Sequence, residues 1–236
     1  MTSTATSFDA SQGAARFAQA AVGRERLHPL VWAYLLTVIL PIGFNLGSVA
    51  MTDLRVVLML TVVPTTVKLF SGKYGKVYPI DYLFFLHIFW AAVALLKNNP
   101  GLALQNVGAF SIEFLGGYTL ARAYIRTPGA FLALIRAIIL LVFIALPFAF
   151  YEAKTGTSLI LTWLSKLPGL WTVAEVNIEK RMGLNRVQVY FAHPIHFGLF
   201  CSSVLTLTFV AMRGIMSDAA RYTASMAVCV CVFLSL

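Results

Sequence analysis

Two arginines close to the end of a long polar segment carry the chemistry that this sequence suggests first. Arg181 and Arg186 lie in the stretch EKRMGLNRVQVYF, shortly before the apolar run that begins near Phe191. A guanidinium is a planar fork of N–H donors that can bind a phosphate through two parallel hydrogen bonds. The pair is therefore a candidate phosphate clamp at the membrane surface. The alternative is that both long side chains extend to the interface without a ligand.

The motif FAHPIHFG follows the arginines and predicts a helix start. Proline fits the first turn of a helix, so Pro194 is expected as the first helical residue and His193 as its cap. His193 and His196 could face one site, but two histidines without a third ligand do not define a metal centre. We expect a structural pair, with proton transfer or substrate contact by His193 as the alternative, and no metal or cofactor.

Ionisable residues inside apolar runs are the next candidates. Glu113 lies near the middle of one run, where an acid costs about 2.5 kcal/mol or more unless it has a partner or faces water. Substrate contact and a helix-holding pair are equally supported for it. Arg55 could add a third positive group to the outer site, although an ion pair with Asp53 is favoured. Asp81 and His87 are expected to serve capping or packing.

The composition identifies the class of protein that must position these groups. Of 236 residues, 59% are hydrophobic and 11% are charged, against about 45–50% and 25% in soluble domains. Soluble enzyme folds, disulfide scaffolds and disordered chains are thereby excluded. The net charge of +9 then reports orientation in a membrane rather than binding to nucleic acid. Cys201, Cys229 and Cys231 lie in apolar runs, where a thiol behaves as a small hydrophobe.

A membrane-crossing helix needs about 20 apolar residues. The sequence predicts an all-α polytopic transmembrane bundle with six full spans and a truncated seventh. The runs are Pro29 to Phe44, Leu54 to Leu69, Pro79 to Leu96, Leu104 to Tyr124, Phe131 to Tyr151, Ala192 to Met212 and Tyr222 to Leu236. The last run would cover only about 22 Å. We therefore expect the sequence to be the N-terminal part of a longer protein, with its C-terminal half missing.

Lys and Arg gather at cytoplasmic span ends, and their distribution favours a cytoplasmic N-terminus. This orientation predicts a cytoplasmic tail over residues 1–28 and a transmembrane region over residues 29–236, with a long outer loop at about 152–191. Within that loop, residues Ser158 to Trp171 have apolar side chains at roughly helical spacing, together with two tryptophans. They predict an interfacial helix that is broken near Pro168.

The order of these features resembles the O-antigen ligase and O-antigen polymerase family. The resemblance covers roughly Asp81 to Leu236. It rests on GYTLARAYIR and LPFAFYEAKTG at the ends of two apolar runs, followed by MGLNRVQVYFAHPIHFG. Arg186, Phe191, His193, Pro194 and Gly198 form its most informative piece.

The resemblance implies a multi-pass protein of the bacterial cytoplasmic (inner) membrane. Its members transfer or polymerise a glycan from a polyprenyl-diphosphate donor onto a lipid or glycan acceptor at the periplasmic face, without metal or cofactor. By the family's pattern Arg186 is the catalytic arginine, which would stabilise the departing diphosphate. The residues themselves add Arg181, Arg55, His193 and Glu113 as candidate substrate-binding groups. The expected partners are the donor, the acceptor and membrane lipids, and nucleic acid is not among them.

One departure from the family limits this expectation. Complete members have further spans and a second periplasmic loop that bears a histidine, and this sequence stops before that region. We therefore expect the fragment to be inactive alone. Two other functions stay open: a transporter or flippase for a polysaccharide precursor, in which Glu113 and broken helices form a midplane site, or a non-catalytic membrane assembly partner.

Overall fold

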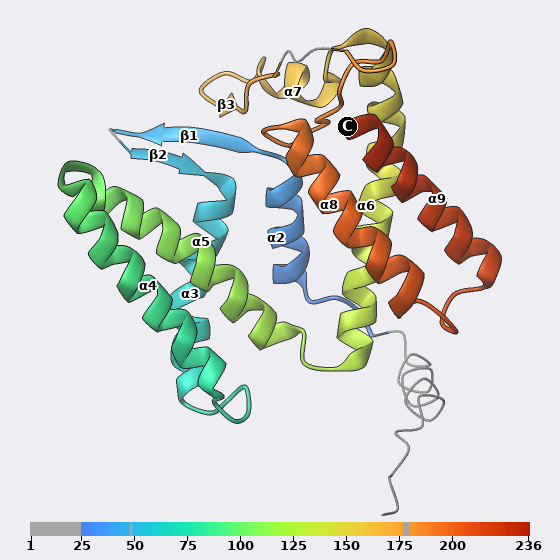
Figure 1. Cartoon of the computed structure of the whole chain (residues 1–236). Helices are drawn as coiled ribbons and strands as arrows, with labels where there is room; N and C mark the ends of the chain where they lie inside the picture. The colour runs from blue at the N-terminus through green and yellow to red at the C-terminus, as the bar shows by residue number, and fades with distance from the viewer. Residues whose placement is uncertain (1–24, 48, 177–179) are drawn as a thin grey trace, which may run out of the picture.

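The computed structural model describes residues 25–47, 49–176 and 180–236 (Figure 1). Most of the expected tail, residues 1–24, therefore lies outside the described residues. The described part is mostly helical, and this coarse class is confirmed. The helices are α2 (Pro29–Ile39), α3 (Asp53–Phe70), α4 (Pro79–Asn98), α5 (Ala103–Tyr124), α6 (Pro128–Thr155), α7 (Leu159–Leu164), α8 (Pro194–Thr206) and α9 (Asp218–Ser235). The strands are β1 (Ile42–Leu46), β2 (Val49–Thr52) and β3 (Trp171–Thr172).

Four of the described helices are long and apolar enough to cross a membrane. They are α4, α6, α8 with its π-helical continuation to Ala211, and α9. Helices α3 and α5 have 18 and 22 residues but are not among these four. Both carry charged side chains, including Arg55 on α3 and Glu113 on α5. The membrane class expected from the composition is supported, whereas six full spans and a partial seventh are not established by length and composition.

The first expected span is wrong over its last third. Helix α2 ends at Ile39 after 11 residues, and β1 and β2 then form an antiparallel hairpin with Gly43 opposite Thr52. Pro41 accounts for this end, because proline lacks an N–H and disfavours helix in the residue before it. The short strand β3 adds to the other edge of β1, which gives the strand order β2-β1-β3.

Two other expected boundaries also change. Helix α9 begins at Asp218, four residues before Tyr222, and has 18 residues. The Ser217 hydroxyl caps it by accepting a hydrogen bond from the Ala220 N–H. The expected interfacial helix is confined to the six residues of α7. It ends before Pro168, and the segment continues into β3.

A buried ion pair joins α4 to α5. Asp81 is fully buried and accepts a hydrogen bond from the Tyr78 N–H at 2.7 Å in a capping box, which confirms its expected capping role. The Arg122 guanidinium lies 3.2 Å from the same carboxylate, and the Tyr118 hydroxyl also donates to it. The buried Asp81 carboxylate is tolerated because it is paired with Arg122 and hydrogen-bonded.

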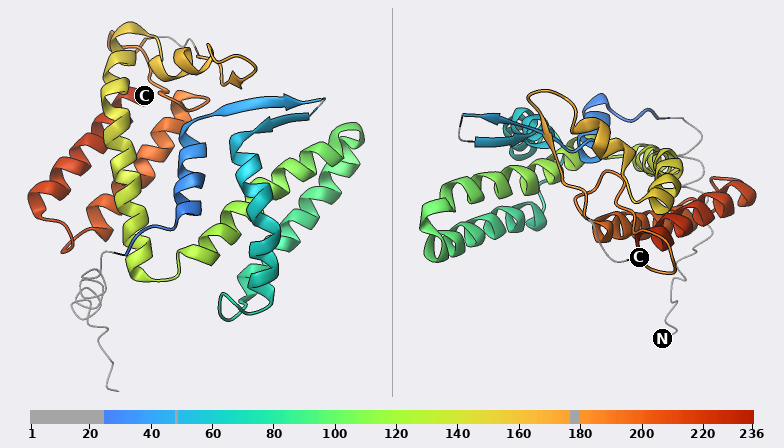
Figure 2. Two further views of the ribbon diagram at one scale, coloured as in Figure 1. Left: turned by 180° about the vertical axis from the view of Figure 1, so that it is seen from behind. Right: turned by 90° about the horizontal axis from the view of Figure 1, so that it is seen from above.

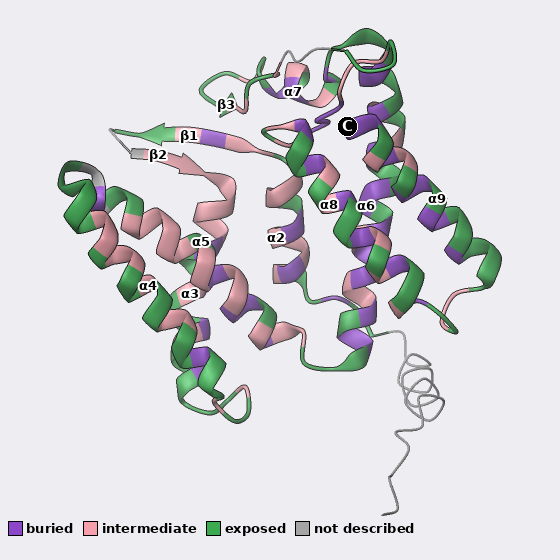
Figure 3. Ribbon diagram, in the orientation of Figure 1, coloured by how far each residue is buried: buried purple, intermediate pink, exposed green. Residues whose placement is uncertain are grey.

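The helices form two packed groups (Figures 1 and 2). Helices α3, α4 and α5 pack together and contact α2 through α3 and α5, whereas α6, α8 and α9 form the other group. The larger core lies in the second group, and α6 is buried along much of its length while α4 is mainly exposed (Figure 3). Chain direction alternates from helix to helix, so the β-hairpin and the segment between α6 and α8 lie at the same end of the molecule.

Candidate anion-binding site

A tight turn sets the position of Arg181. The Arg181 N–H donates to the Leu184 carbonyl at 3.0 Å, and the Leu184 N–H donates to the Arg181 carbonyl at 2.9 Å. The two residues between them, Met182 and Gly183, have φ values of 52° and 78°. Positive φ at both central positions is the geometry of a two-residue hairpin turn. The turn folds Arg181 back toward the segment that contains Arg186.

Arg181 and Arg186 line the same cavity of about 260 Å³. Phe233, Leu234 and Leu236 at the end of α9 form its apolar wall. The structure therefore brings together the two arginines that the sequence singled out. Arg181 is exposed and Arg186 is partly buried, so one guanidinium faces solvent while the other is held closer to the protein.

The ion pairs among the described residues are Arg55 with Glu113, Arg122 with Asp81, and Arg221 with Asp218. Neither cavity arginine therefore pairs with a described carboxylate. Arg186 uses one N–H on the Ser235 carbonyl, at 3.5 Å. A guanidinium has five N–H donors, so donors of both side chains remain for an anion beside this cavity, whose own wall is mainly apolar.

Glu152 positions the backbone that follows Arg186, a role that was not expected from the sequence. The residue is 4% exposed, and its carboxylate accepts hydrogen bonds from the Gln188 N–H at 2.8 Å and the Val189 N–H at 2.9 Å. Val189 has a φ of 54°, a strained value for a β-branched residue. The two hydrogen bonds to Glu152 hold this conformation. The sequence signal was an acid in the last turn of an apolar helix, where the helix dipole disfavours it.

Two amides fix the same segment from other sides. The Gln188 side chain is 2% exposed, accepts from the Val176 N–H at 2.8 Å, and donates to the Ala174 and Phe191 carbonyls at 3.1 and 3.0 Å. Asn185 donates from its backbone and its side chain to the Ala153 carbonyl.

A further backbone hydrogen bond runs from the Val187 N–H to the Leu234 carbonyl at 3.0 Å. Arg186 therefore projects from a segment that is held by the end of α6, the end of α9 and the loop before it.

Tyr190 closes the inner side of this segment. Its side chain is 1% exposed, and its hydroxyl has no hydrogen-bond partner among the described residues. Burial raises the pKa of the Tyr190 phenol above its ordinary value, so the hydroxyl stays protonated. The neighbouring Val189 carbonyl accepts a hydrogen bond from the Ser158 hydroxyl, which also caps α7.

His193 caps α8, as the sequence predicted. Its Nδ1 accepts a hydrogen bond from the Ile195 N–H at 3.2 Å, and Pro194 is the first residue of the helix. The His193 and His196 rings lie 6.1 Å apart between centroids. Within the described ranges, no three His, Cys, Asp or Glu side chains gather where they could hold a metal ion. His193 has a structural contact here, and its role toward substrate stays a prediction.

Arg55 pairs with Glu113 rather than with Asp53. The Arg55 Nε lies 2.7 Å from the Glu113 carboxylate, whereas Asp53 accepts a hydrogen bond from the Leu54 N–H. The expected Arg55–Asp53 pair is therefore wrong. The reason is tertiary: α3 and α5 pack closely where Gly116 meets Leu58, which brings Glu113 to the first turn of α3. Neither Arg55 nor Glu113 lines the cavity of the two other arginines.

The fold and the site define a mostly helical protein with four described helices able to cross a membrane and two cationic side chains in a cavity at one end. Comparisons with protein-family models, with curated proteins and with solved structures found no match to this chain.

Proposed function

We propose that this chain acts in an integral-membrane glycosyltransferase of the O-antigen ligase or polymerase type. In this proposal it binds the diphosphate of a polyprenyl-diphosphate-linked glycan at the periplasmic face of the bacterial cytoplasmic membrane, and the acceptor is a lipid or another glycan. The observation that carries the proposal is that Arg181 and Arg186 line one cavity without a carboxylate partner among the described residues. The ordered motifs around Arg186 add the resemblance to that family.

The arrangement suits the departure of a lipid diphosphate. Negative charge builds up on the diphosphate as its bond to the glycan breaks, and donors already in place stabilise that charge without reorganising. Arg186 meets this requirement because Glu152, Ala153 and Leu234 accept hydrogen bonds from backbone N–H groups on both sides of it and so fix the segment that carries it. Arg181, on the exposed turn, would close over the diphosphate once it is bound.

The proposal includes a topology finer than the four candidate helices. We place α3 and α5 across the membrane as well, with the Arg55–Glu113 pair holding these two helices together. The N-terminus lies in the cytoplasm, and α2 together with β1 makes the first crossing. The turns after α3, α5 and α8 would then be cytoplasmic. Basic residues in and beside these turns support this placement because positive charge favours that side; they are Lys68, Lys73, Lys76, Arg122, Arg126, Arg213 and Arg221.

The test is replacement of Arg186 in the cell that makes the protein. Arg186→Ala should lower the amount of transferred or polymerised glycan by about 10²–10³-fold, the usual effect of removing one oxyanion-stabilising donor, with protein abundance and membrane insertion unchanged. Arg186→Lys should recover only part of the activity, because an ammonium lacks the planar fork. Arg213→Ala, an exposed arginine at the opposite end, is the matched control.

Glycan assembly that is unaffected by Arg186→Ala would remove this residue from the mechanism and leave a membrane assembly partner as the better function. Loss of transport after Glu113→Gln, with Arg186→Ala silent, would favour a transporter or flippase.

A further inference from the structure

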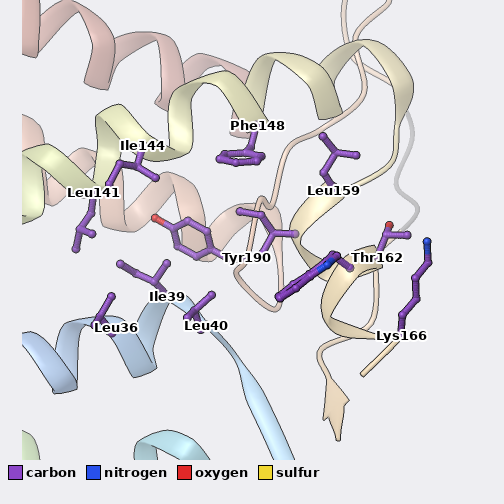
Figure 4. A pocket seen from close by; sticks show the side chains of 12 residues that line it. Leu36, Ile39, Leu40, Leu141, Ile144, Phe148, Leu159, Thr162, Lys166 and Tyr190 are labelled. Carbon is purple, nitrogen blue, oxygen red and sulfur yellow. The ribbon is translucent and has the colours of Figure 1, made fainter. Parts of the chain in front are cut away.

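A second cavity lies between α2, α6 and α7 and shares no lining residue with the arginine cavity. Its volume is about 650 Å³, within the range of about 300–1,000 Å³ that is typical of ligand sites. Leu36, Leu141, Ile144 and Phe148 are among the apolar side chains that surround it (Figure 4). The cavity therefore offers a continuous apolar surface to a hydrocarbon group.

Polar groups occur at opposite ends of this cavity. Lys166 lies beyond α7 at one end, and its side chain extends away from the apolar residues (Figure 4). It pairs with no carboxylate of the described residues. Tyr190 reaches in from the loop at the other end, with its hydroxyl toward Leu141. That hydroxyl has no hydrogen-bond partner among the described residues.

The edge of the cavity carries exposed apolar side chains. Leu36 and Ile144 at its edge are 48% and 50% exposed, and Trp163 is 64% exposed. Ile144 lies on α6, one of the helices able to cross a bilayer. Tryptophan and lysine side chains favour the headgroup layer, with the lysine stem on apolar surface and its ammonium in water. An exposed apolar edge beside these side chains suits contact with bilayer lipid.

We propose that this cavity is a binding site for one phosphoglycerolipid of the bilayer. One acyl chain extends along α6 toward Tyr190, and the phosphate binds the Lys166 ammonium. The site is separate from the proposed glycan-donor site and rests only on the membrane location of the protein. Bound lipid would hold α2 and α7 against α6, next to the segment that carries Arg186.

The test uses the full chain, extracted from membranes in mild detergent, with bound lipids counted by native mass spectrometry and identified after extraction. The wild-type protein should retain one phosphoglycerolipid. Ile144→Trp fills the cavity from an exposed position and should lower lipid affinity by about tenfold, which corresponds to 1.4 kcal/mol. Phe143→Trp is the matched control, because Phe143 is its neighbour on α6, is also exposed and does not line the cavity.

Lys166→Ala provides a second variant at an exposed position, where folding is not at risk. It should weaken retention of phosphatidylglycerol and phosphatidylethanolamine but leave that of diacylglycerol, which lacks a phosphate, unchanged. Lys154→Ala, an exposed lysine outside the cavity, should have no effect. Equal lipid retention by wild type and Ile144→Trp would overturn the proposal. So would a copurified lipid that is a polyprenyl phosphate, or one whose binding is insensitive to Lys166.

Discussion

At the scale of single residues, the cavity arginines depend on a residue that makes no contact with the cavity. Glu152 is buried and accepts hydrogen bonds from two consecutive backbone N–H groups beyond Arg186. Both N–H groups require an acceptor, and a carboxylate has one oxygen for each. A glutamine at this position would direct its NH₂ group at one of the two donors. It has the shape of glutamate but would leave one N–H group without an acceptor.

Glu152→Gln should therefore destabilise the protein by about 1–3 kcal/mol, the cost of a buried group left unsatisfied. The measurement is thermal unfolding in detergent. Glu175→Gln is the control, because Glu175 is exposed and accepts its bond from the Thr162 hydroxyl. In the Glu152→Gln variant, binding of inorganic diphosphate should also weaken, although both cavity arginines are intact. An unfolding midpoint equal to that of the control would show that Glu152 does not support the loop.

At the scale of elements, two glycines of α5 differ in what surrounds them. A Cβ added to Gly116 would lie 2.9 Å from the Cβ of Leu58 on α3, whereas one added to Gly108 would meet nothing within 4 Å. Close approach at Gly116 is what allows α3 and α5 to pack and the Arg55–Glu113 pair to form. The same substitution should consequently have opposite effects at the two positions.

Gly116→Ala should destabilise the α3–α5 pair by about 1–3 kcal/mol through overpacking. Gly108→Ala should be neutral or stabilise the protein by up to about 1 kcal/mol, because alanine favours helix over glycine. Chemical unfolding of the two variants in detergent gives both values. If both alanines stabilise the protein, α3 and α5 do not pack through Gly116 as described.

At the scale of the whole molecule, alternation of helix direction assigns each turn to one end. Met182 is 87% exposed beside the arginine cavity, and Ser71 is exposed at the opposite end after α3. The proposed topology places the first outside the membrane and the second in the cytoplasm.

The corresponding experiment is thiol labelling in a background in which Cys201, Cys229 and Cys231 are replaced by alanine. In intact spheroplasts, Met182→Cys should react with a membrane-impermeant maleimide, and Ser71→Cys should react only after permeabilisation. The reverse pattern would invert the proposed orientation and place the arginine cavity in the cytoplasm.

Much of the helical fold was predictable because its signals are local. Apolar composition indicated the membrane class, and His193 with Pro194 marked the start of α8, since a cap and a first-turn proline act within one helical turn. The spacing of Arg181 and Arg186 also identified the two cavity arginines. The end of α2 was missed although Pro41 was visible, because the run stayed apolar into β1 and hydropathy alone does not distinguish an apolar strand from an apolar helix.

Only the tertiary structure decided which partner each charged or polar group meets. Glu113 found Arg55 across 58 positions of sequence, and Glu152 found the Gln188 and Val189 N–H groups 36 and 37 positions away. Neither pairing has a local signature, because it depends on how closely α3 approaches α5 and on where the loop returns to α6. The sequence by itself determined a helical membrane protein with two arginines near one of its surfaces. Long-range packing decided that these arginines share one cavity and that a buried glutamate on another element holds the backbone beside them, since hydrogen bonds form between atoms that are close in space, whatever their separation along the chain.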